Sequence, residues 1–142
     1  MSIQFSLISQ DKVVTESEAD EVLIPTAMGQ IGVLPHHVDL ITQLKTGEVT
    51  VIKAGREDHF AVYGGVAQVS TKEVIILADR AEQVADIDLA KAEQAKRDAE
   101  KLKETAQTDI ELAHAYALIE RNLNRIALVK KRRHGSKSTF NQ

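Results

Sequence analysis

The sequence predicts an α+β protein, with an N-terminal antiparallel β-sandwich over residues 1–85 and a C-terminal antiparallel two-helix hairpin over residues 86–133. Three observations predict this fold. Short β-rich runs separated by turn signals fill the first part of the chain. Both prolines and every glycine except Gly135 also lie there. From Asp86 onward the composition changes to Ala, Glu, Lys, Gln and Leu, which are good helix formers.

The predicted strands begin at the N-terminus, where Ile3, Phe5 and Leu7 alternate with other residues at the period of a strand. Further β-rich runs carry Val22, Ile24, Val38, Leu40, Val49, Val51, Phe60, Val62, Val66, Val69, Val74, Ile76 and Leu77. Turn signals separate these runs every 8–12 residues, as in all-β sandwiches and barrels. The Gly64-Gly65 pair is one of these turn signals.

The first helix is predicted to begin at Asp86 or Asp88, either of which can cap it. One stripe of the helix carries Leu89, Ala92, Ala95 or Lys96, Ala99 and Leu102, at steps of three and four. The helix is about 17 residues long and ends at a break over residues 105–108.

The second helix, about 22 residues long, is predicted to be capped by Thr108 or Asp109. Its apolar stripe consists of Leu112, Tyr116, Ile119, Leu123 and Ile126, with Ala113, Ala115 and Ala117 on or beside it. Small alanine faces allow close packing but bury little apolar area. Because burial contributes about 25 cal/mol of free energy per Å², a contact made of alanines is weak compared with one made of Leu and Ile. The hairpin is therefore predicted either to be marginal and able to open toward a partner, or to stay docked. The segment 134–142 is predicted to be disordered.

Composition and charge limit the classes of function. The chain has no cysteine, which excludes disulfides and thiolate chemistry, and no apolar run approaches the ~20 residues of a membrane-spanning helix. Residues 1–85 carry 12 acidic and 6 basic side chains, whereas residues 86–142 carry 9 and 12. The asymmetry indicates two units with different partners, or only a solvated helix end at residues 130–133.

Candidate catalytic and metal-binding residues are sparse. His36 and His37 with Asp39, and His59 elsewhere, could begin a metal site, but adjacent residues of a strand point to opposite faces. The sequence contains no nucleophile elbow, phosphate-binding loop or dinucleotide fingerprint. These observations predict that the chain is not an enzyme by itself.

Several segments, taken in order, resemble the epsilon subunit family of F-type ATP synthases. The series consists of residues 29–37 (GQIGVLPHH), 38–47 (VDLITQLKTG), Gly64-Gly65 with Val69, residues 75–82 (IILADRAE) and Ile87-Asp88. Each motif is weak alone, but together they extend over about residues 1–130. The resemblance implies a ten-stranded sandwich followed by two helices. It also implies a non-catalytic central-stalk subunit that links the gamma subunit to the c-subunit ring and couples proton flow to ATP synthesis.

The resemblance also assigns partners and site residues. A loop matching Gln30, Ile31, Gly32, His36 and His37 would face the c ring and gamma. Here Gln30 replaces the usual Glu, and His36 stands at a Gly position where positive φ is hard for a side chain to adopt. The helical hairpin would inhibit ATP hydrolysis through basic residues that meet the beta subunit, namely Arg121, Arg125, Lys130, Lys131, Arg132 and Arg133.

Some members of the family bind ATP in the folded hairpin, which would make the chain an ATP-sensing module. The matching residues here are Glu82, Ile87, Asp88, Lys91, Ala92, Arg121 and Arg125. Lys91 replaces an arginine, keeping the charge but losing the planar fork for bidentate phosphate contact. A further basic position of the pattern falls on Asp98. Whether ATP binds as a regulatory ligand thus stays open, and no cofactor is expected to be required.

The run Lys130–Arg133 leaves one alternative, an adaptor for nucleic acid or anionic lipid. The run lacks interleaved aromatic residues for base stacking, and an acidic protein partner fits equally well. The resemblance favours a protein partner, no nucleic acid, and membrane contact only through the complex. It implies a peripheral location at the cytoplasmic face of a bacterial inner membrane.

Overall fold

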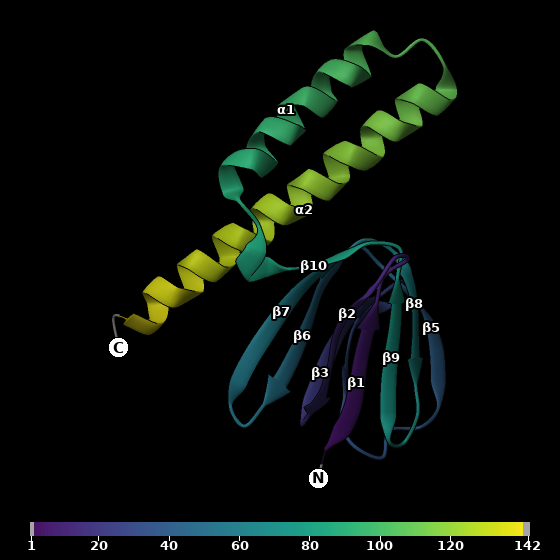
Figure 1. Ribbon diagram of the computed structural model, residues 1–142, viewed down its shortest axis with the longest axis vertical. Helices are drawn as coiled ribbons and strands as arrows, with labels where there is room; N and C mark the ends of the chain where they lie inside the picture. The colour runs from purple at the N-terminus through teal and green to yellow at the C-terminus, as the bar shows by residue number, and fades with distance from the viewer. Residues whose placement is uncertain (1, 141–142) are drawn as a thin grey trace. The chain divides into compact units, whose positions relative to one another are not determined.

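The computed structural model describes residues 2–140, and it describes side chains for residues 2–133. The chain divides into two compact units, Met1–Gln83 and Val84–Gln142, close to the boundary predicted after residue 85. The first unit is built of strands and the second of helices (Figure 1).

The first unit contains ten strands joined by short connections. Their bounds are β1 Ile3–Ile8, β2 Val13–Ala19, β3 Glu21–Thr26, β4 Gly29–Val33, β5 Leu40–Leu44, β6 Gly47–Lys53, β7 Arg56–Val62, β8 Gly65–Val69, β9 Glu73–Ala78 and β10 Ala81–Gln83. They pair in the order β10-β7-β6-β3-β5-β8-β9-β1-β2, and β4 pairs with β3. The predicted sandwich, ten-stranded by the resemblance, is confirmed.

Strands β1 and β3 each pair with strands that are distant in sequence. Strand β1 pairs with β2 in antiparallel and with β9 in parallel, so the N-terminus lies beside a strand distant in sequence. Strand β3 pairs with β4 along its length and, on its other edge, first with β6 and then with β5. Pro25 lies between those two pairings, so its missing N–H removes no ladder bond to β5 or β6.

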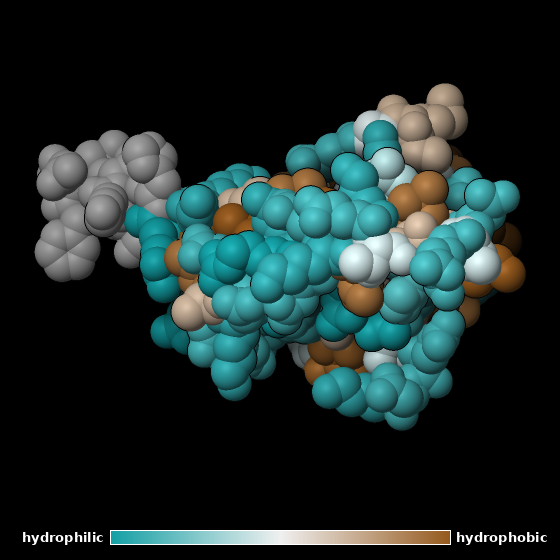
Figure 2. All heavy atoms as spheres, turned by 90° about the horizontal axis from the view of Figure 1, so that it is seen from above, coloured by the Kyte–Doolittle hydropathy of each residue, from teal (hydrophilic) through white to brown (hydrophobic). Residues whose placement is uncertain are grey.

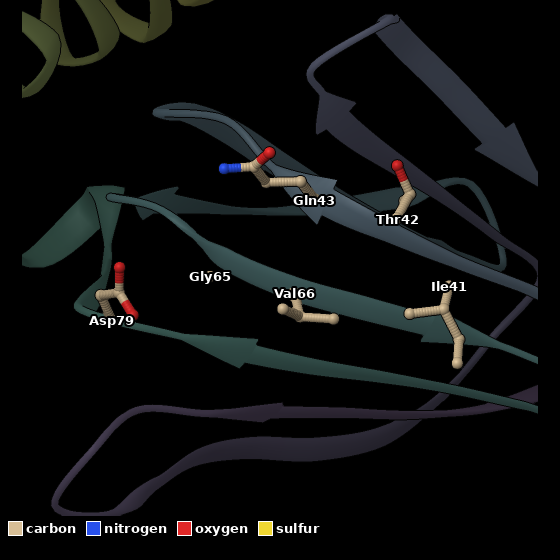
Figure 3. A pocket seen from close by; sticks show the side chains of 6 residues that line it. All are labelled: Ile41, Thr42, Gln43, Gly65, Val66 and Asp79. Atoms are coloured by element: carbon tan, nitrogen blue, oxygen red, sulfur yellow. The ribbon is translucent and has the colours of Figure 1, made fainter.

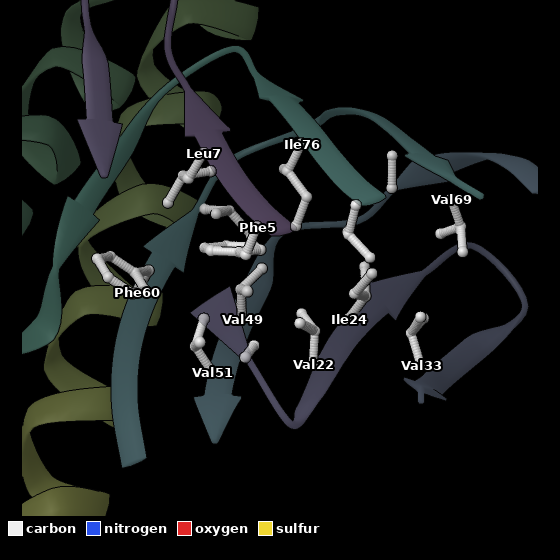
Figure 4. Packing of buried hydrophobic residues seen from close by; sticks show 14 of the residues in the cluster. Phe5, Leu7, Val22, Ile24, Val33, Val49, Val51, Phe60, Val69 and Ile76 are labelled. Carbon is white, nitrogen blue, oxygen red and sulfur yellow. The ribbon is translucent and has the colours of Figure 1, made fainter. Parts of the chain in front are cut away.

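One apolar core fills the sandwich (Figure 4). Ile3, Phe5 and Leu7 are fully buried, as their alternation predicts, and each is worth about 1.5–3 kcal/mol of transfer free energy. The rings of Phe5 and Phe60 pack with centroids 6.5 Å apart. Because the alternating residues of facing strands share this core, the sandwich is a single packed body.

The Gly64-Gly65 turn requires glycine for a steric reason. Gly65 has φ +126°, and a Cβ there would collide with the backbone carbonyl of Leu77 on the paired strand. The backbones of β8 and β9 therefore approach too closely for a side chain at this position.

Not every predicted strand residue belongs to the core. Val38 lies in the connection between β4 and β5, outside any strand, and is 74% exposed, so its predicted strand position is wrong. Val66 and Leu77 do lie in strands, but on the outer face, and both are exposed.

The second unit begins with a short 3-10 turn, η1 Val84–Asp86, and helix α1 Leu89–Thr105. Of the two predicted caps, Asp88 is the one used: its carboxylate accepts a hydrogen bond from the Lys91 amide at 3.2 Å. Since α1 has 17 residues, its predicted length is confirmed, and it ends at Thr105, the first residue of the predicted break.

Helix α2 Asp109–Phe140 follows a three-residue connection and runs antiparallel beside α1 (Figure 1). Thr108 caps it by accepting the Glu111 amide, while the Glu111 carboxylate accepts the Gln107 amide. The helix is longer than predicted and passes Gly135. The side chains of residues 134–140 and all of residues 141–142, where a disordered tail was predicted, lie outside the described residues.

The buried face of α2 differs from the predicted stripe. Leu112, Ile119 and Ile126 of that stripe are half-buried, but Tyr116 and Leu123 are about half exposed. Ala115, predicted on or beside the stripe, and Asn122 are buried. The true packing face is thus centred one residue earlier than predicted, because the stripe was assigned from the largest apolar side chains. In α1 the predicted positions Ala92 and Ala99 are buried.

Candidate interaction surfaces

The segment predicted to face the c ring and gamma consists of a strand and the connection after it. Gln30 and Gly32 are exposed on β4, and Ile31 is half-buried against the core. The turn that follows places Leu34 and Val38 in solvent, both more than half exposed. The segment is therefore accessible, with apolar side chains beside its polar groups.

His36 adopts the conformation that its glycine-like position requires. Its φ is +70°, and its amide donates to the carbonyl of Thr71 at 2.9 Å. The His37 amide donates to Leu34 at 3.2 Å, which closes the turn. The expected conflict is thus resolved by strain at His36, at a cost of about 1–2 kcal/mol for an L-residue in this region. The His37 ring turns to its own neighbour, with Nδ1 2.7 Å from the Val38 carbonyl oxygen.

A second surface was not predicted. The outer faces of β5, β8 and β9 expose Ile41, Val66 and Leu77, and Val66 lies directly opposite Leu77 in the ladder. We call these three residues the outer apolar face. A signal for it was present in the sequence: three consecutive apolar residues at 75–77 cannot all point into one core when side chains alternate.

A shallow hollow of about 470 Å³ adjoins the outer apolar face (Figure 3). Ile41 and Val66 supply its apolar lining, and its other lining residues are Thr42, Gln43, Gly65 and Asp79. The hollow combines apolar surface with one carboxylate. It could receive an apolar side chain of a partner next to a hydrogen-bond donor.

Most of the residues predicted to contact ATP gather at the base of the hairpin. Ile87, Asp88, Lys91 and Ala92 lie around the start of α1. Antiparallel helices place residues equally far from their connection at the same level, so this turn of α1 lies level with residues 121–126 of α2. Arg121 and Arg125 belong to that turn and lie on one helix face.

The remaining residues of the ATP pattern have other partners or lie elsewhere. Glu82 lies on β10, in the sandwich, where it accepts a hydrogen bond from the Tyr63 hydroxyl at 2.8 Å. Asp98 is exposed on α1 and accepts from the Gln94 amide at 2.9 Å. If the hairpin binds a phosphate, the positive charge of the site would come from Lys91, Arg121 and Arg125.

The basic residues predicted to contact the beta subunit lie along α2. Lys130, Lys131 and Arg133 are exposed, whereas Arg121, Arg125 and Arg132 are half-buried. Arg125 donates to the side chain of Asn122 at 3.2 Å. Lys130 and Arg133 are exposed toward an acidic partner. Lys131, although exposed, and the three half-buried arginines make contacts within the protein.

Within the described chain, no helix is both long and apolar enough to cross a membrane. Hydrophilic side chains predominate on the face shown in Figure 2, with apolar side chains exposed among them. No group of three or more His, Cys, Asp and Glu among the described residues is arranged to hold a metal ion.

Comparison with known proteins gives consistent sequence matches. The family model for the ATP synthase delta/epsilon chain, beta-sandwich domain, matches residues 2–84. An ATP synthase epsilon chain of Herpetosiphon aurantiacus is 37% identical over 134 residues, covering 94% of this chain and 98% of the relative. One of Hydrogenovibrio crunogenus is 39% identical over 127 residues, covering 84% and 88%.

Solved structures share the fold. A chain of the Euglena gracilis mitochondrial ATP synthase, from a structure of OSCP, F1 and the c ring, aligns with a TM-score of 0.76 and 25% identity. The alignment covers 89% of this chain and 80% of that one. A chain of the Tetrahymena thermophila mitochondrial ATP synthase central stalk and c ring aligns with a TM-score of 0.58 and 11% identity, covering 91% and 97%. At that identity the second match shows the fold alone.

Proposed function

The chain belongs to the epsilon family of ATP synthase, and from this premise we propose that it is a non-catalytic rotor subunit linking gamma to the c ring. In this role it couples proton flow to ATP synthesis. The observation that carries the proposal is the division into a compact β unit with accessible apolar surface and a second, helical unit. Such a division suits a platform that stays bound and an arm that moves.

The outer apolar face supports a docking role for the sandwich. Exposed, contiguous apolar residues next to a hollow are typical of protein interfaces, and here they extend over three neighbouring strands. We assign gamma to this face and the c ring to the accessible segment Gln30–His37. The loss of a carboxylate at Gln30 leaves a neutral contact in that segment.

Gamma binding is tested by co-purification with the full chain. Val66→Asp places a charge in the outer apolar face and should abolish or strongly weaken recovery of gamma. Val13→Asp is the matched control, because Val13 is also an exposed valine but lies on β2. If both variants recover gamma as well as the parent chain does, the assignment of this face is wrong.

The hairpin is proposed as an inhibitory arm whose exposed basic residues meet an acidic segment of the beta subunit. An exposed ion pair contributes only about 0–1 kcal/mol, so several of Lys130, Lys131 and Arg133 have to act together. Ending the chain after Asp86 should preserve assembly and increase ATP hydrolysis by the complex. Unchanged hydrolysis would remove the inhibitory role and leave the docking role standing.

A regulatory ATP site is a second candidate, favoured by the grouping of Asp88 and Lys91 at the level of Arg121 and Arg125. ATP at millimolar concentration should slow proteolysis of the hairpin. Arg125→Ala should abolish this protection, and Lys91→Arg, which restores a planar fork, should strengthen it. Absence of protection in the parent chain would reject the candidate.

As part of the complex, the chain is proposed to lie at the cytoplasmic face of a bacterial inner membrane without entering the bilayer. The alternative of a nucleic-acid or lipid adaptor acting through Lys130–Arg133 predicts binding that weakens steeply with salt. Retention of the free chain on anionic vesicles at physiological ionic strength would favour that alternative over contact through the complex.

A further inference from the structure

The buried part of the contact between the two helices of the hairpin contains one polar side chain, among the described residues. Ala92 and Ala99 are the buried residues of α1, and Ala115 and Asn122 are their buried counterparts in the facing part of α2. In both helices these residues are spaced by seven, the repeat that keeps one face toward a partner helix. We call the four residues the helix seam.

The positions of the seam residues pair across the hairpin. Ala99 lies six residues before the end of α1 at Thr105, and Ala115 lies six residues after the start of α2 at Asp109. Ala92 and Asn122 are likewise each thirteen residues from those ends. Since antiparallel helices rise equally per residue, Ala99 lies level with Ala115 and Ala92 level with Asn122. Three alanines and one asparagine therefore form the buried centre of the contact. Half-buried Leu112, Ile119 and Ile126 flank it on α2, and Lys103 of α1 lies 5.2 Å from the ring centroid of Tyr116.

Asn122 is buried, with 4% of its surface exposed, yet it makes no hydrogen bond to α1. Its Nδ2 donates to the Leu118 carbonyl at 2.8 Å, and its Oδ1 accepts from Arg125 at 3.2 Å. Both partners belong to α2 and move with Asn122. Separating the helices therefore breaks no hydrogen bond of this side chain.

The same amide gains hydrogen bonds when the helices separate. A primary amide can make four hydrogen bonds, and Asn122 makes two within the described residues. Separation lets water reach the remaining N–H and lone pair, each worth about as much as an ordinary hydrogen bond. An alanine at this position would gain nothing on separation.

We propose that Asn122 is the residue that keeps the hairpin close to the balance between joined and separated helices. It occupies a seam position without stabilising the seam, and it lowers the free-energy cost of releasing α2 from α1. The inference concerns the hairpin itself. Its meaning for rotor regulation rests on the proposed function, but the separation of the helices can be measured in the isolated chain.

The experiment measures the distance between spin labels on the two helices by pulsed electron paramagnetic resonance. The chain has no native cysteine, so labels attach only at Ala90→Cys on α1 and Ala127→Cys on α2, both exposed positions. The parent chain should show a joined and a separated population. Asn122→Ala should reduce the ratio of separated to joined chains by about fivefold or more, because the variant cannot gain the one or two water hydrogen bonds that the amide gains on separation.

Two further variants make the result specific. Gln94→Ala removes an exposed amide of α1 outside the seam and should leave the ratio unchanged. Ala92→Leu places a large side chain level with Asn122 and should raise the separated population. A parent chain without a separated population, or an Asn122→Ala variant in which that population is unchanged or larger, overturns the proposal. Neither result bears on gamma binding by the sandwich.

Discussion

The sandwich and the hairpin are each stabilised internally by a different kind of contact. The sandwich encloses fully buried Phe, Ile, Leu and Val side chains from strands distant in sequence. In the hairpin, the buried centre of the contact between the two helices consists of alanines and one asparagine. Large interlocking side chains make a rigid body, whereas a narrow alanine contact makes a separable pair. The comparison predicts a rigid sandwich and a pair of helices that separates more easily.

Phe5→Ala should have the largest effect on this comparison. The ring is fully buried and packs on Phe60, so its removal should lower the free energy of unfolding of the sandwich by about 3–5 kcal/mol. Urea unfolding followed by the β-sheet circular dichroism signal measures the loss. A loss below about 1 kcal/mol would mean that the core is not a single packed body.

Gly65→Ala should be next in magnitude. The residue has positive φ, and a Cβ would collide with the Leu77 carbonyl, so a loss of about 3 kcal/mol is expected from strain and displaced backbone. Gly55→Ala is the matched control, since Gly55 has positive φ but nothing within 4 Å of the added Cβ. Equal losses in the two variants would assign the whole effect to φ and none to the close approach of β8 and β9.

Asp88→Ala should act on the hairpin alone. It removes the side chain that caps α1, at a cost of about 1 kcal/mol of helix stability. Hydrogen exchange should quicken in the first turn of α1 and remain unchanged in the strands. Faster exchange throughout the sandwich would show that the two units do not unfold independently.

His36→Gly should have the smallest effect, and of opposite sign. Glycine relieves the strain at φ +70° but increases the entropy of the unfolded chain, so a net gain of about 0.5 kcal/mol is expected. A shift of the urea midpoint to higher concentration would confirm it. Destabilisation would instead show that the His36 side chain makes contacts worth more than the strain.

Local patterns predicted much of the fold. The alternation of Ile3, Phe5 and Leu7 identified a core strand, and the Thr105–Thr108 break identified the helix ends, because period and capping are local properties. The parallel pairing of β1 with β9 could not be predicted this way, since it joins distant segments. The exposure of Tyr116 and Leu123 was missed because the larger side chains were taken to mark the packing face. In this hairpin the most deeply buried positions of the contact carry small side chains.

The candidate surfaces were predicted less well than the fold. The segment around Gln30 and His36 was found through resemblance, while the outer apolar face needed the strand register to show that Ile41, Val66 and Leu77 share a side. The position of Asn122 in the seam depends on where both helices end, and a shift of one residue would have moved it out of contact.

The most direct test of the account is the affinity of gamma for the sandwich alone. Binding of gamma to the full chain is compared with binding to a chain that ends after Gln83, the last residue of the β unit. Equal affinities within a factor of about three are expected, because the proposed docking surface lies wholly in the sandwich. A truncated chain that folds but no longer binds gamma would contradict the assignment of platform and arm to separate units.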